Sequence, residues 1–239
     1  MHEYYRKNIG KIRKRMNGYL KLTKNEIEGI FGKPYAEAFL EIWEYYETRI
    51  LEILPYIGGG KVSGTKNLTG CMFFVSIGVV GKKHGLSLED WGRLSTTIYE
   101  RYFARCPRFM RTAVPYLIRR HPFIVYKMLK LKDRRNEKNA AKTPGSFVTQ
   151  AMKPTDEYPL IYHNLHCPVY DFCEMAGYMD YLPYLCNLDY VMFKAFNVSL
   201  QRRKTCSTGD GLCDFTISRN APIPSVWPPH ILDDADPLK

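Results

Sequence analysis

Residues 198–219 read VSLQRRKTCSTGDGLCDFTISR, and this stretch decides the fold class of the C-terminal half. Two runs rich in β-branched and aromatic residues, 198–207 and 212–219, flank a TGDG turn at 208–211. Runs of this kind around a glycine-rich turn predict two antiparallel strands joined as a hairpin. Successive side chains of a strand point to opposite faces, so Cys213 and Phe215 share one face of the second strand.

Upstream of this hairpin, the sequence predicts two more short strands and two helices. The segments 146–152 and 160–166 are rich in β-branched and aromatic residues, which is typical of strands. The segments 168–176 and 181–196 have the length and spacing of helices, and the first opens with proline and is followed by glycine. Both helices fall between the second and third predicted strands.

The N-terminal half reads as a series of helices. Helical patterns are expected at 1–24, 33–54, 68–84, 87–103 and 107–131, with a break near His121 and Pro122. The segment 68–84 fits either a buried strand or a buried helix, and its length favours a helix. The fold class is therefore α+β, with a helical N-terminal half packed on a C-terminal antiparallel sheet that carries two inserted helices.

Three regions follow from this pattern: a basic helical region at 1–142, an α+β region at 143–221, and an extended proline-rich tail at 222–239, together expected to form one compact unit. The longest apolar run, 71–80, is about half of what a membrane helix needs, so no membrane span is expected. No signal-peptide pattern precedes the first helix, which predicts a cytoplasmic protein. Seven cysteines without a CxxC pair favour reduced thiols.

The net charge of +11 is unevenly distributed. Residues 1–142 hold 28 basic and 13 acidic side chains, whereas residues 143–239 hold 7 and 11. The densest basic stretch is 101–142, with 13 basic and two acidic residues. Such a stretch could bind nucleic acid, attract an anionic substrate, or form a solvated helical face. No known nucleic-acid-binding motif accompanies it, so we expect no specific nucleic-acid binding.

The residues that suggest chemistry gather in the last third of the chain. Cys167 precedes Pro168 and is expected at the N-cap of a helix, where backbone N–H groups and the helix dipole stabilise a thiolate. Cys186 and Asp189 are three residues apart and share one face of a predicted helix. A carboxylate beside a thiol can accept a proton or orient the reacting group. Each of these residues could instead be a structural part of the core.

A metal site is a further possibility, because His163 and His166 lie next to Cys167. On a strand, these two histidines would point to opposite faces, which argues against a shared ion. No close pair of soft ligands supports structural zinc. The sequence therefore predicts no metal and no other cofactor.

Taken together, these motifs resemble the L-2-amino-thiazoline-4-carboxylic acid hydrolase family. The resemblance runs through His163–Pro168, Cys186 with Asp189, Arg202, and the closing sequence GDGLCDF at 209–215. It implies a hydrolase that opens a C–N bond of a cyclic amidine or amide in a small substrate carrying a carboxylate. The closing hairpin also resembles 4-vinyl reductase type domains, which implies a non-catalytic sensor or carrier as the alternative.

The resemblance also implies roles for individual residues. Cys186, Asp189, Cys167 and His163 would be catalytic. Arg202, Cys213 and Asp210 would bind the substrate, although the pattern alone favours Asp210 as a turn former. The expected partner is a small anionic substrate, and a homo-oligomer is possible.

Overall fold

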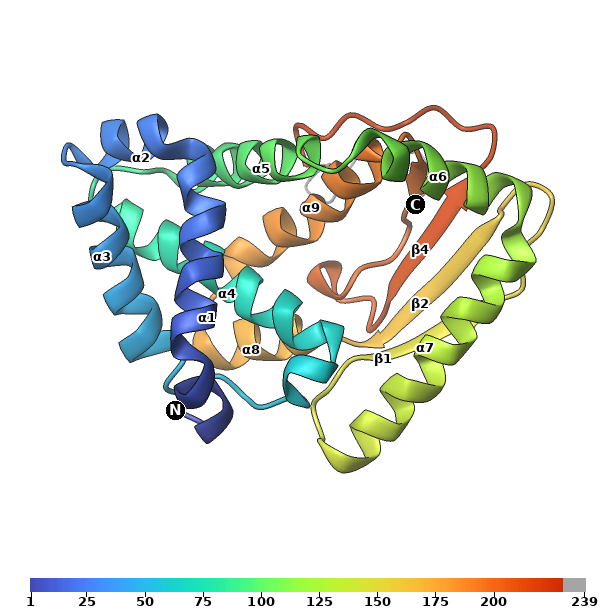
Figure 1. The fold of residues 1–239 in the computed structure, drawn as a ribbon, viewed down its shortest axis with the longest axis horizontal. Coiled ribbons are helices and arrows are strands. Elements are labelled where there is room, and N and C mark those ends of the chain that lie inside the picture. Colours follow the sequence, from blue (N-terminus) through green and yellow to red (C-terminus); the bar gives the residue numbers. More distant parts are fainter. Residues whose placement is uncertain (230–239) are drawn as a thin grey trace.

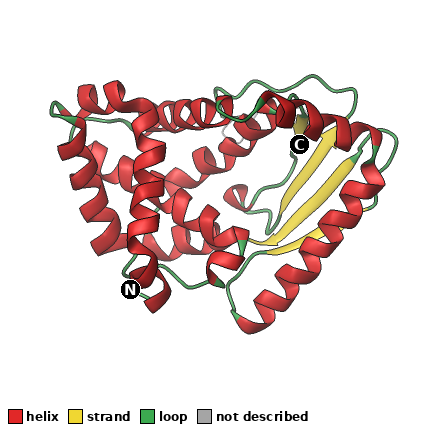
Figure 2. Cartoon of the chain, in the orientation of Figure 1, coloured by secondary structure: helices red, strands yellow, loops and turns green. Residues whose placement is uncertain are grey.

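The computed structural model describes residues 1–229, and its architecture is the predicted α+β fold. A helical N-terminal half lies beside a four-stranded antiparallel sheet (Figures 1 and 2). One connected hydrophobic core includes residues from both halves. The sheet and the helices are thus packed on each other, as the sequence predicted.

Most of the first seven helices were expected from the sequence pattern, but α2 was not, and the helix expected at 33–54 is α3 followed by a π-helical turn, Tyr46–Ile50. The bounds of these seven helices are α1 Glu3–Leu20, α2 Lys24–Phe31, α3 Tyr35–Tyr45, α4 Ser63–Lys82, α5 Leu88–Ala104, α6 Arg108–Arg120 and α7 Pro122–Lys142. The ambiguous segment is a helix, α4, and the predicted break at Pro122 separates α6 from α7. α7 extends eleven residues beyond its predicted end, because this polar segment consists mainly of good helix formers.

Helix α4 forms the centre of the helical half. Five consecutive residues in its middle, from Cys71 to Val75, are each buried. A helix that is buried on all sides must be covered by neighbours all round. α4 packs against α1, α3, α5 and α8, which explains why its sequence shows little alternation between apolar and polar faces.

The sheet has the strand order β1-β2-β4-β3, and every pair is antiparallel. The strands are β1 Val148–Met152, β2 Leu160–His166, β3 Ser199–Gln201 and β4 Cys213–Ser218. In the register of β2 and β4, Asn164 lies opposite Cys213 and Tyr162 lies opposite Phe215. This register determines which side chains meet on the face that looks toward the helices.

The predicted strand at 198–207 is wrong in its second half. β3 pairs with β4 as expected but ends at Gln201, and the chain reaches β4 through a short helical turn, Cys206–Thr208. The strand ends early because a side chain, and not the backbone of β4, accepts the hydrogen bonds of two N–H groups just beyond its end. The carboxylate of Asp214 accepts from the N–H groups of Arg203 (3.0 Å) and Lys204 (2.9 Å), which removes them from the strand ladder.

Two helices are inserted between β2 and β3, as predicted: α8 Pro168–Ala176 and α9 Leu182–Ala195. α8 ends at Gly177, which has a positive φ of 75°. α9 packs closely on α5, because Gly92 leaves room for the ring of Tyr184. A Cβ atom at Gly92 would lie 2.2 Å from that ring, so the approach requires glycine.

Helix α7 covers the open edge of the sheet along β1 (Figure 1). Asp133 is 3% exposed, and its carboxylate accepts from the backbone N–H of Ala151 (2.7 Å) and from the hydroxyl of Thr149 (2.8 Å). Asn136 donates to the same hydroxyl (2.9 Å). These bonds anchor α7 to the sheet and protect the edge strand.

The proline-rich tail is described as far as residue 229, and the remainder of the predicted tail lies outside the described residues. Up to that point it has irregular structure and packs on α5 and α9. The backbone oxygen of Val226 accepts from Asn187 (2.8 Å), and Arg93 lies over the ring of Trp227. Among residues 1–229, no helix is both long enough and apolar enough to cross a lipid bilayer.

Candidate functional site

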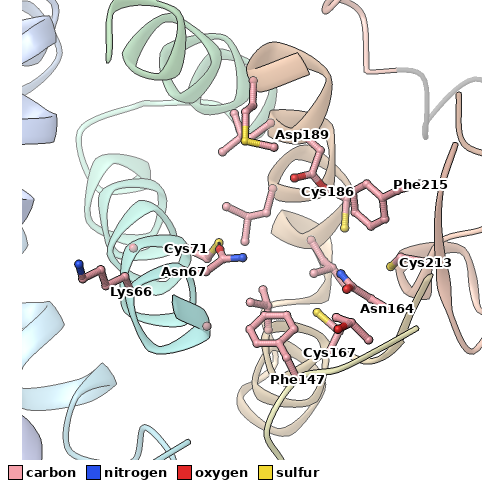
Figure 3. Close-up of a pocket in the computed structure, with 18 of the residues that line it drawn as sticks. Lys66, Asn67, Cys71, Phe147, Asn164, Cys167, Cys186, Asp189, Cys213 and Phe215 are labelled. Carbon is pink, nitrogen blue, oxygen red and sulfur yellow. Dashed lines mark hydrogen bonds between the residues drawn. The ribbon is translucent and has the colours of Figure 1, made fainter. Parts of the chain in front are cut away.

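A cavity of about 360 Å³ lies between the helical half and the inner face of the sheet. α4 and α5 line one side of it, and α9, β2, β4 and the start of α8 line the other (Figure 3). Four thiols and two oppositely charged groups belong to the lining: Cys71, Cys167, Cys186, Cys213, Asp189 and Arg202. All seven cysteines of the chain lie within the described residues and are free thiols.

The sheet contributes its inner face to the cavity through the register of its strands. Tyr162 and Asn164 of β2 and Cys213 and Phe215 of β4 all line it. The rings of Tyr162 and Phe215 are stacked, with centroids 4.5 Å apart. Asn164 is the direct strand partner of Cys213, so its amide lies beside the thiol.

Arg202 and Asp189 form an ion pair in the wall of the cavity. Nη1 of Arg202 donates to Oδ2 of Asp189 and to the backbone oxygen of Cys186, both at 3.1 Å. The guanidinium also lies 4.4 Å from the ring centroid of Phe215. Burial raises the pKa of the Asp189 carboxyl above its ordinary value, although Arg202 works in the opposite direction. The raised pKa suits a carboxyl group that holds and releases a proton.

Cys213 has a backbone N–H group directed at its sulfur and a second thiol beside it. The sulfur atoms of Cys206 and Cys213 are 3.5 Å apart, and the backbone N–H of Cys206 donates to the Cys213 sulfur at 3.3 Å. The Cys206 thiol, the Arg202 guanidinium and this N–H together lower the pKa of the Cys213 thiol, against the effect of burial. Of these two neighbouring thiols, Cys213 is therefore the one favoured as a thiolate.

The other candidate thiols behave differently from the sequence prediction. Cys167 is the N-cap of α8, as expected. However, burial raises the pKa of its thiol to about 12 and outweighs the backbone N–H groups of Tyr170 and Val169. Burial also raises the pKa of the Cys186 thiol well above its ordinary value. The expectation that the helix terminus would depress the Cys167 pKa is thus wrong.

Two predicted site residues are not brought to the cavity. His163 lies between Tyr162 and Asn164 on β2, so strand alternation points it to the opposite face of the sheet. Asp210 shapes the β3–β4 connection, where its carboxylate accepts from the N–H of Thr205 (3.1 Å) and the hydroxyl of Thr208 (2.6 Å). The pattern-based interpretation of Asp210 as a turn former agrees with this placement, and we assign neither residue a role in the cavity.

Lys132 on α7 also lines the cavity, although it was not among the predicted site residues. Its ammonium lies 6.0 Å from the ring centroid of Tyr162. Two cation–π contacts and one ring stack thus form a continuous row across the sheet face: Lys132 contacts Tyr162, Tyr162 stacks on Phe215, and Phe215 contacts Arg202. Desolvation by the groups packed around its ammonium lowers the pKa of Lys132, although the side chain is partly open to solvent. The only sequence signal was its position in a basic stretch, which did not distinguish it from the other lysines and arginines of that stretch.

The helical side contributes Asn67 and Cys71 of α4, which face the sheet in Figure 3, while Lys66 points away. The thiol of Cys71 donates to the amide oxygen of Asn67 at 3.1 Å. Asn67 and Lys132 are both exposed, so the cavity opens to solvent near them. Within residues 1–229, no three His, Cys, Asp or Glu side chains are grouped closely enough to hold a metal ion.

Comparison with known proteins agrees with the resemblance seen in the motifs. The family model described as L-2-amino-thiazoline-4-carboxylic acid hydrolase matches residues 97–217, half of the chain. The matched range contains the sheet, α8 and α9, and therefore most of the chemical groups of the cavity. No curated protein and no solved structure gives a significant match. The chain belongs to the L-2-amino-thiazoline-4-carboxylic acid hydrolase family.

Proposed function

We propose that the protein is a hydrolase that opens the ring of a cyclic amidine or amide in a small substrate carrying a carboxylate. The observation that carries the proposal is a thiol favoured as thiolate, Cys213, in the same cavity as a carboxyl with a raised pKa, Asp189. Nucleophilic catalysis by cysteine needs such a thiolate, and a departing nitrogen needs a proton donor. The family match to the same part of the chain supports this assignment.

The proposed reaction uses the groups as follows. The Cys213 thiolate adds to the ring carbon, the C–N bond breaks, and the departing nitrogen takes a proton from Asp189. Water then attacks the same carbon, returns one proton to Asp189 and expels the thiolate, while its other proton stays with the product. The overall reaction adds one water, and the enzyme returns to its starting state.

Asn164 and Lys132 complete the proposed site. The side-chain amide of Asn164 has no hydrogen bond to another group within the described residues. It lies beside the Cys213 thiol, where its N–H can donate to the substrate at the carbon that Cys213 attacks. Arg202 was the predicted anchor for the substrate carboxylate, but its Nη1 atom already binds Asp189 and Cys186, and its Nε atom is buried out of reach of solvent. We therefore assign the carboxylate anchor to Lys132, a lysine at the opening of the cavity.

The test is turnover by the purified full chain of two matched compounds, L-2-amino-thiazoline-4-carboxylate and 2-amino-thiazoline, which lacks the carboxylate. We expect the first to yield a ring-opened product heavier by one water, and the second to react much more slowly. The proposal fails if neither compound nor any related cyclic amidine or lactam is converted. If the carboxylate compound then still binds in calorimetry, the sensor or carrier alternative explains the cavity better.

A further inference from the structure

Helices α6 and α7 carry an exposed apolar surface that the proposed function does not use. Of the fourteen large hydrophobic side chains that are exposed among residues 1–229, seven lie on α6 and α7. They are Phe109, Met110, Tyr116, Phe123, Ile124, Met128 and Leu131. Phe109 is 71% exposed and Phe123 is 61% exposed, which is far more than a side chain packed in a core. Concentrated exposure of this kind marks a surface that contacts something else.

The helical spacing places these residues on outward faces. On α7, Phe123, Ile124, Met128 and Leu131 lie on the side opposite to Val125 and the sheet-bound Asp133, both of which are buried. On α6, Phe109 and Tyr116 are seven residues apart and share one face. The two helices meet at Pro122, and both lie along the outer margin of the molecule (Figure 1).

The charge around this surface is almost entirely positive. The range 101–142 has 13 basic and two acidic residues. One of the two, Asp133, is buried against β1, so Glu137 is the acidic side chain of this range that is exposed. Arg108, Arg111, Arg119, Arg120 and Lys127 alternate with the apolar residues and are exposed. The surface therefore combines aromatic and aliphatic groups with cations.

We propose that the outward face of α6 and α7 binds the surface of an anionic lipid membrane. The aromatic and aliphatic side chains would enter the boundary between headgroups and acyl chains, and the arginines and lysines would pair with anionic headgroups. Because no described helix can span a bilayer, the contact is peripheral. This proposal does not depend on the reaction assigned to the cavity.

The same observations disfavour the other possible occupants. A second copy docked symmetrically on this face would bring two strongly basic surfaces together. Nucleic acid would pair with the cations and stack on the aromatic rings. It would leave the aliphatic residues Ile124, Met128 and Leu131 in contact with water or phosphate. A lipid surface satisfies both kinds of side chain.

The test is co-sedimentation of the full chain with vesicles of phosphatidylcholine alone or mixed with phosphatidylserine. We expect binding to the mixed vesicles only, decreasing as salt is raised. The double variant Phe109→Ser/Phe123→Ser keeps the charge and should bind at least about tenfold more weakly, because two aromatic side chains leave the boundary region. The matched control, Leu40→Ser/Met175→Ser, changes two exposed apolar residues elsewhere and should bind like the parent.

Several results would overturn the proposal. One is failure of the parent to bind anionic vesicles at low salt, and another is equal binding by the parent and the Phe109→Ser/Phe123→Ser variant. A third is a dimer, detected by light scattering, that this variant abolishes. A fourth is salt-dependent nanomolar binding of nucleic acid that the same variant abolishes. The variants' thermal unfolding midpoints should match the parent's, since the substituted residues are exposed.

Discussion

The backbone N–H of Cys206 donates to the sulfur of Cys213 at 3.3 Å, across the connection that replaces the second half of the predicted third strand. The irregular backbone at this point thus has a chemical consequence. A regular hairpin would direct its N–H groups at the neighbouring strand, whereas the helical turn Cys206–Thr208 directs one at a thiol that lines the cavity. Cys213 is therefore the thiol that we assign as nucleophile.

The first prediction concerns the ionisation of Cys213. Its pKa is lowered, so alkylation of this thiol should reach half its maximal rate at a pH below the ordinary thiol value of about 8.5. Cys206→Ala removes the neighbouring thiol and should move that pH upward. The measurement is the pH dependence of iodoacetamide labelling at Cys213, read by peptide mass spectrometry. An unchanged profile in the variant would show that Cys206 does not stabilise the thiolate.

The ion pair between Arg202 and Asp189 gives the second prediction. The Arg202 side chain is 1% exposed, and Arg202→Met leaves Asp189 without its partner. We expect this variant to lose about 1 to 3 kcal/mol of unfolding free energy in chemical denaturation, because the Asp189 side chain is 35% exposed and water can replace part of the lost contact. The double variant Arg202→Met/Asp189→Asn should lose less than the sum of the two single losses, because the two side chains interact directly. Additive losses would mean that the two residues do not interact in solution.

Lys132 provides the third prediction. Lys132→Met should raise KM for the carboxylate substrate about tenfold or more with a smaller change in kcat, because the anchor acts mainly in binding. Lys153→Met, at an exposed lysine outside the cavity, should leave both constants unchanged. Desolvation lowers the pKa of the Lys132 ammonium, so the parent's KM should begin to rise at a pH below the ordinary lysine range, as the ammonium loses its proton. Equal KM values for parent and Lys132→Met would remove Lys132 from the site.

The fourth prediction tests how α7 is attached to the sheet. Asp133→Ala leaves the N–H of Ala151 and the hydroxyl of Thr149 without their carboxylate, and should cost about 2 to 4 kcal/mol of unfolding free energy. Glu137→Ala removes an exposed carboxylate one turn later and should cost about 0.5 kcal/mol or less. If both variants unfold at the same denaturant concentration, the carboxylate of Asp133 does not hold the helix.

Local sequence signals predicted most of the fold. Pro168 and Gly177 mark the two ends of α8, and Ser87 caps α5 with its hydroxyl accepting from the N–H of Asp90. These boundaries depend on residues close in sequence, which is why they can be predicted. The early end of β3 depends instead on the carboxylate of Asp214, which lies ten or more residues away and gives no local signal.

The site was predicted only in part, for the same reason. The helical spacing of Cys186 and Asp189 indicated a shared face, and both residues line the cavity. Strand alternation, applied from Tyr162 and Asn164, would have excluded His163, but the orientation of β2 toward the helices was not known. The approach of Lys132 to the sheet follows from the packing of α7 on β1, which no sequence pattern shows.

The most direct test of the central claim is to trap the covalent intermediate. The parent is mixed with L-2-amino-thiazoline-4-carboxylate, quenched in acid within one turnover, digested and examined by peptide mass spectrometry. We predict a substrate adduct on the peptide that contains Cys213. Cys213→Ala should show neither adduct nor turnover, whereas Cys106→Ala, a thiol outside the cavity lining of the described chain, should show both. An adduct on Cys186 or Cys167, or full turnover by Cys213→Ala, would contradict the account.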